Sequence, residues 1–130
     1  MMTEGQAMRV LLVDDEGELV SALAERLFFR GIQADWTTDG KKAVEMAAAV
    51  AYDVIVLDMK MPGVSGLSVM QKIKETSPGP GFVFLTGHGS EEDRDAGRAA
   101  GASFYLMKPV KIDVLVEKMK MAAIEAGKNV

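Results

Sequence analysis

Short runs of branched, apolar residues alternate with longer stretches whose apolar residues recur every three or four positions. Of all features of the sequence, this alternation restricts the possible folds most strongly. The runs at 8–13, 54–58 and 82–86 are apolar almost throughout, as is typical of parallel strands covered on both faces. Runs at 32–37 and 103–107 complete five expected strands. With a helix after each strand, right-handed crossovers predict an α/β fold, a doubly wound parallel sheet with helices on both faces.

The stretches between these runs carry helix signals. Asp39 can cap a helix that begins at Gly40, and Ser90 with Asp93 resembles a capping box in which Asp stands where Glu or Gln is usual. Apolar stripes at helical spacing mark three core-facing surfaces. Their members are Leu19, Val20, Leu23, Ala24 and Leu27, then Leu67, Met70 and Ile73, and finally Ile112, Leu115, Val116 and Met119.

Length and composition favour one domain over residues 1–130, with a core at about 8–125 and a flexible segment at 1–7. The chain has no cysteine, which excludes disulfides and thiolate metal sites. Its formal net charge of −4 argues against direct nucleic-acid binding. No apolar run approaches the roughly 20 residues of a membrane span, and the N-terminus lacks the pattern of a signal peptide. We therefore expect a cytoplasmic protein without membrane contact.

Polar residues stand at the ends of four predicted strands. Asp14 and Asp15 follow the first strand, Asp58 ends the third, Thr86 ends the fourth and Lys108 follows the fifth. Ligands of doubly wound sheets bind outside the carboxyl ends of the strands. We therefore expect these five side chains to meet at one edge of the sheet.

The adjacent carboxylates of Asp14 and Asp15 need a positive partner. Like charges about 4 Å apart repel by roughly 4 kcal/mol at an effective dielectric near 20. A cation bound between these carboxylates and Asp58 would remove the repulsion. The alternative for Asp14 and Asp15 is N-capping and dipole compensation at the first helix.

Four motifs, "VDDE", "VLDMKMPGVSG", "FLTGHG" and "FYLMKP", together make the chain resemble the receiver domain of two-component response regulators over about 8–125. The resemblance implies a flavodoxin-like five-stranded sheet of order 2-1-3-4-5 with five helices. It also implies that Asp58 accepts a phosphoryl group from a histidine kinase, a phosphotransfer protein or a small phosphodonor. Asp15, Asp58 and the backbone carbonyl of Lys60 would bind Mg²⁺, with Asp14 acting through a water.

Further roles follow from the same resemblance. Lys108 balances charge on the transferring oxygens, while the Thr86 hydroxyl hydrogen-bonds one of them. The peptide bond before Pro109 is expected to be cis. Tyr105 is expected to be an aromatic switch that turns inward when Thr86 is drawn to the phosphoryl group, altering the surface around the fourth helix, fifth strand and fifth helix. The alternative for Tyr105 is a static interface residue.

Lys60 and His88 stand two residues beyond the phosphoacceptor and the threonine, positions that flank the path of the hydrolysing water in the family that the chain resembles. We expect both side chains to lie over the phosphoryl oxygens and hinder in-line attack. His88 can instead orient the water, or remain a solvated loop residue without effect.

Other function classes fit less well. Aspartyl-nucleophile phosphatases carry a second Asp two residues after the nucleophile, where this chain has Lys60. A flavin mononucleotide site needs a phosphate loop after the first strand, where "DDEG" would repel the phosphate. A phosphorylation-independent interaction module remains the alternative. We expect a signalling domain rather than a classical enzyme, with self-catalysed phosphotransfer and dephosphorylation, a downstream partner or missing output domain, and a possible homodimer.

Overall fold

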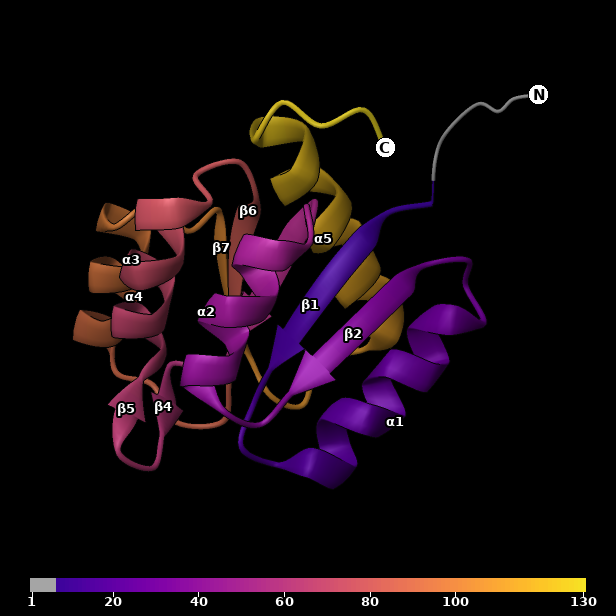
Figure 1. Ribbon diagram of the computed structural model, residues 1–130. Helices are drawn as coiled ribbons and strands as arrows, with labels where there is room; N and C mark the ends of the chain where they lie inside the picture. Colours follow the sequence, from indigo (N-terminus) through magenta and orange to yellow (C-terminus); the bar gives the residue numbers. More distant parts are fainter. Residues whose placement is uncertain (1–6) are drawn as a thin grey trace.

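A single parallel sheet organises the molecule, whose computed structural model describes residues 7–130 (Figure 1). Residues 1–7 were expected to be flexible, and residues 1–6 of that segment lie outside the described range. The strands of the sheet follow the order β2-β1-β3-β6-β7, which confirms the predicted topology. Their bounds are β1 Arg9–Val13, β2 Gln33–Thr37, β3 Val54–Leu57, β6 Gly81–Thr86 and β7 Phe104–Met107. The helices are α1 Gly17–Phe28, α2 Gly40–Ala49, α3 Gly66–Thr76, α4 Glu91–Ala99 and α5 Ile112–Glu125.

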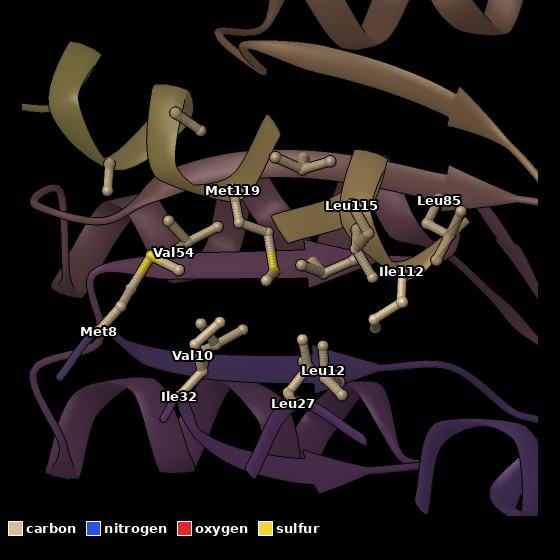
Figure 2. Packing of buried hydrophobic residues seen from close by; sticks show 14 of the residues in the cluster. Met8, Val10, Leu12, Leu27, Ile32, Val54, Leu85, Ile112, Leu115 and Met119 are labelled. Atoms are coloured by element: carbon tan, nitrogen blue, oxygen red, sulfur yellow. The ribbon is translucent and has the colours of Figure 1, made fainter. Parts of the chain in front are cut away.

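Helices cover both faces of the sheet, as the apolar strands require. Every residue of β3 and β6 is buried, which explains why these runs lack the alternation of a half-exposed strand. Residues of α1 and α5 pack in one core cluster, whereas residues of α2 and α3 pack in the other. Figure 2 shows the first cluster, in which Leu115 and Met119 of α5 lie over Val10 and Leu12 of β1.

The predicted helix starts are confirmed by their hydrogen bonds. Asp39 is the N-cap of α2, and its Oδ1 accepts from the Lys41 amide at 3.0 Å. At α4, the Asp93 amide donates to Ser90 Oγ at 3.1 Å and the Ser90 amide donates to Asp93 Oδ2 at 3.2 Å. These paired bonds form the capping box, with Asp in the place of the longer acid.

The sequence did not predict a small hairpin that follows β3. Its strands, β4 Lys60–Met61 and β5 Val64–Ser65, pair antiparallel and lie at one end of the molecule beside α3 (Figure 1). The turn contains Gly63 at a φ of +77°, a conformation that side chains disfavour. Two-residue strands are too short to show a hydrophobic period, so the pattern gave no signal for them.

Helix α4 is the least deeply packed of the five helices. Gly97 is its one buried residue, and a Cβ there would lie 3.0 Å from the Phe84 ring. Lys74 of α3 holds the far end of the helix, donating from Nζ to the Ala100 carbonyl at 2.8 Å. The bond from Lys74 therefore adds a polar contact to the shallow packing of α4.

No helix within residues 7–130 is both long enough and apolar enough to cross a lipid bilayer.

Candidate functional site

The three expected acidic residues meet at the carboxyl ends of β1 and β3. These strands are neighbours with Val13 opposite Leu57, so the residues that follow them lie side by side. One carboxylate oxygen from each of Asp14, Asp15 and Asp58 lies within 4.8 Å of the others. Asp14 and Asp58 are buried, whereas Asp15 is exposed. The predicted convergence is confirmed for this acidic cluster.

Lys108 reaches the same place from the end of β7. Its Nζ lies 2.7 Å from Asp14 Oδ2, 2.9 Å from Glu16 Oε1 and 3.5 Å from Asp58 Oδ2. The ammonium thus leans toward the β1 end of the site rather than toward Asp58. The peptide bond between Lys108 and Pro109 is cis, as expected.

Glu16 was missed as a partner of the lysine. Its adjacency to Asp14 and Asp15 in the sequence was the available signal, since a third carboxylate beside a charged strand end attracts any nearby cation. Glu16 is also the N-cap of α1, yet its side chain makes no capping bond. Asp14 Oδ1 accepts instead from the Glu16 amide at 2.9 Å. The alternative role in helix capping therefore accounts for one hydrogen bond of Asp14. It accounts for no hydrogen bond of Asp15 in this structure.

Burial and pairing act against each other on these ionisable groups. Burial raises the pKa of Asp14, while the hydrogen bond from Lys108 pulls that pKa down, and the net direction is upward. Burial alone would lower the pKa of Lys108, but the hydrogen bonds to Asp14 and Glu16 outweigh it and raise the pKa. The same contact with Lys108 lowers the pKa of Glu16. Lys108 thus remains charged and compensates a carboxylate that burial disfavours.

The donor set suits a hard divalent cation. Three carboxylates offer oxygen ligands, which Mg²⁺ prefers, and the described residues of the chain supply no sulfur ligand at this cluster. The Lys60 amide donates to Asp58 Oδ1 at 3.1 Å, which fixes the orientation of that carboxylate. A ligand role for the Lys60 carbonyl stays a prediction.

Thr86 lies at the expected strand end, fully buried, with its hydroxyl bonded to the loop that follows. Thr86 Oγ1 donates to the His88 carbonyl at 3.0 Å and accepts from the His88 amide at 3.2 Å. The His88 residue itself is exposed. The threonine hydroxyl therefore orders the 86–88 loop in this state.

Tyr105 packs on the face predicted by strand alternation. It lies against the cluster that contains Phe84, with ring centroids 5.9 Å apart, whereas Phe104 and Leu106 face the other cluster. The Tyr105 hydroxyl is buried and has no hydrogen-bond partner among residues 7–130. Burial, followed by the charges of Asp93 and Asp58, raises the pKa of Tyr105. An unpaired buried hydroxyl costs about 1–3 kcal/mol, so this ring position is paid for by the packing around it.

The side chain of Lys60 has a partner that the sequence did not indicate. Its Nζ lies 3.4 Å from Asp93 Oδ2 in the first turn of α4. The Lys60 ammonium is therefore held by Asp93 of α4 and not by the Asp58 carboxylate.

Comparison with protein families gives a match to the response regulator receiver domain over residues 10–120. Among curated proteins, the chain is 36% identical over 124 residues to the probable transcriptional regulatory protein TcrX of Mycobacterium tuberculosis. That alignment covers 95% of this chain and 53% of the relative, so the chain spans about half the length of that protein.

Solved structures give the same picture. A CheY-like response regulator receiver domain protein from Methanospirillum hungatei superposes with a TM-score of 0.87 at 26% identity, covering 96% of this chain and all 100% of the other. A response regulator from Burkholderia pseudomallei, crystallised with a phosphorylated aspartic acid, calcium ion and citrate, superposes with a TM-score of 0.83 at 25% identity. That match covers 92% of this chain and 71% of the other.

Proposed function

This chain belongs to the response regulator receiver domain family, and from that premise we propose that Asp58 accepts a phosphoryl group from a histidine kinase, a phosphotransfer protein or a small phosphodonor. The observation that carries the proposal is the meeting of Asp58 with Asp14, Asp15 and Lys108 at one sheet edge. The Burkholderia pseudomallei relative contains a phosphorylated aspartic acid, which supports the same chemistry here.

The residues of the site have separate roles in this transfer. A carboxylate oxygen of Asp58 attacks phosphorus while the bond from phosphorus to the donor breaks, and the leaving group departs with its electron pair. The Lys60 amide orients the attacking carboxylate, and Lys108 supplies a charge within reach of the transferring oxygens. Asp14, Asp15 and Asp58 would hold Mg²⁺, which supplies further positive charge there when bound.

The signal then passes through Thr86 and Tyr105. A phosphoryl oxygen on Asp58 competes with the His88 carbonyl for the Thr86 hydroxyl, which loosens the 86–88 loop. Tyr105 moves with that loop, and the surface formed by α4, β7 and α5 changes. The proposed partner that recognises this surface is a downstream protein, an output domain or a second copy of the chain. An output domain would correspond to the part of relatives such as TcrX that this chain does not cover.

A phosphorylation-independent interaction module is the less supported reading. Such a module has no need for a buried carboxylate pair compensated by a lysine. This chain keeps all five of the acidic, hydroxyl and lysine side chains and places them at the carboxyl ends of the strands.

Phosphorylation of Asp58 is tested by intact mass. With acetyl phosphate and Mg²⁺, the wild-type chain should gain one phosphoryl group, whereas Asp58→Asn should gain none because an amide is a poor nucleophile. Asp95→Asn, which removes an exposed carboxylate from α4, should behave as wild type. A full adduct on Asp58→Asn would contradict the assignment.

Magnesium should stabilise the folded chain. Binding to the native state alone adds about 2.7 kcal/mol to the free energy of unfolding at about a hundredfold excess over Kd. We expect thermal melting in low salt to show this increase on addition of MgCl₂ and Asp15→Asn to lose most of it. Sodium chloride at matched ionic strength controls for screening. An unchanged melting temperature would show that Lys108 alone neutralises the cluster.

A further inference from the structure

The ion pair between Lys60 and Asp93 joins the phosphoacceptor loop to α4. Lys60 lies two residues after Asp58, and its Nζ lies 3.4 Å from Asp93 Oδ2. We propose that Asp93 is a positioning residue that holds the Lys60 ammonium away from the phosphorylated Asp58 and thereby shortens the lifetime of the phosphoryl group. The inference rests on the proposed phosphorylation of Asp58.

Asp93 is well placed to compete for this lysine. The oxygen that faces Lys60 Nζ, Oδ2, also accepts the Ser90 amide in the capping box, so the start of α4 fixes its position. The Asp93 side chain is 29% exposed and the Lys60 side chain 58% exposed. A carboxylate already ordered by its own helix loses little freedom when it binds the ammonium. The lysine, in contrast, is free enough to change partners.

The backbone of Lys60 ties the same residue to Asp58. Its amide donates to Asp58 Oδ1 at 3.1 Å, so the base of the side chain stands beside the phosphoacceptor. A phosphoryl group there carries about two negative charges and attracts the ammonium that Asp93 otherwise holds. The side chain of Lys60 therefore divides its time between the two anions.

Hydrolysis depends on which anion Lys60 contacts. A water oxygen attacks phosphorus, the bond between phosphorus and the Asp58 oxygen breaks, and the carboxylate and inorganic phosphate are released with one proton passing to solvent. An ammonium against the phosphoryl oxygens occupies the space that the water must cross. Asp93 keeps that space open by drawing Lys60 toward α4.

Asp93→Asn is the informative variant. Asparagine keeps an oxygen that can accept the Ser90 amide, but it lacks the charge that binds Lys60. An exposed ion pair of this kind shifts its equilibrium by up to about fivefold, so we expect the half-life of the phosphoprotein to lengthen about two- to fivefold. The measurement is the loss of the phosphoryl mass with time after removal of acetyl phosphate, at constant pH and excess Mg²⁺.

Three further variants separate positioning from helix stability. Asp93→Asn should have no effect in a Lys60→Ala background, because no ammonium remains to be released. Asp93→Glu keeps the charge and should therefore keep the short half-life of the wild-type phosphoprotein. Glu92→Gln, which removes a neighbouring exposed charge, should also leave the half-life unchanged. Amide exchange across α4 in the unphosphorylated variants reports any fraying of the helix.

The outcomes are distinct. An unchanged half-life in Asp93→Asn, or an equal lengthening with and without Lys60, overturns the role of Asp93 while leaving phosphorylation of Asp58 intact. A wild-type chain that takes up no phosphoryl group contradicts the proposed function itself, and with it this role.

Discussion

Gly66→Ala is expected to lower the free energy of unfolding by about 2–3 kcal/mol and to slow phosphorylation. A Cβ at position 66 would lie 2.1 Å from the Asp58 backbone oxygen and 3.0 Å from Met59 Cα. Both are backbone atoms, which cannot move aside as a flexible side chain does. The Gly66 amide also donates to the Met59 carbonyl at 2.7 Å, which holds the two segments together. The substitution therefore displaces the backbone that carries the phosphoacceptor.

Urea unfolding of the metal-free chain measures the loss, and intact mass measures the rate of phosphorylation. Gly17→Ala is the matched control, because Gly17 also begins a helix but a Cβ there meets Thr38 Cγ2 at an ordinary 3.5 Å. That variant should be neutral or slightly stabilising, since alanine favours helix formation. A Gly66→Ala protein as stable as wild type would show that the backbone of Asp58 is not held closely against α3.

Lys108→Met should destabilise the metal-free chain by about 3 kcal/mol near neutral pH. The substitution keeps an apolar stem but removes the ammonium, leaving the buried carboxylates of Asp14 and Asp58 uncompensated. The loss should shrink at acidic pH, because burial raises the pKa of Asp14 and that carboxyl then takes up a proton instead of needing a cation. Chemical unfolding at pH 8 and pH 5 measures both effects.

The same variant links stability to the acidic cluster. Added Mg²⁺ should restore more stability to Lys108→Met than it adds to wild type, since the variant lacks the competing ammonium. Lys120→Met, which changes an exposed lysine of α5, should lose less than about 0.5 kcal/mol at either pH. A loss in Lys108→Met that is independent of both pH and Mg²⁺ would point to packing rather than charge.

The sheet and the acidic cluster were predictable for physical reasons. The runs that became β3 and β6 are buried on both faces, so their apolar character shows directly in the sequence. Once the strands are parallel, their carboxyl ends share one edge, and Asp14, Asp58 and Lys108 must approach one another. The positions of these side chains followed from the sequence pattern, whereas the phosphoacceptor role of Asp58 followed from the resemblance to receiver domains.

The contacts of long side chains were not predictable. Glu16 binds Lys108 across 92 positions of sequence, and Lys60 reaches Asp93 in a separate helix. Both contacts depend on side-chain rotamers that only the complete fold determines. In the sequence, a charged residue beside a turn looks the same whether its side chain is solvated or paired. The hairpin of β4 and β5 was missed because it is too short for a period.

The location of the phosphoryl group tests the central claim most directly. Borohydride reduces an acyl phosphate on aspartate to the alcohol of homoserine and so marks the residue that was phosphorylated. After treatment with acetyl phosphate and Mg²⁺, peptide mass mapping should find this mark at Asp58 and nowhere else in the chain. A mark at Asp14 or Asp15, or a phosphorylated chain that carries no such mark, would contradict the account.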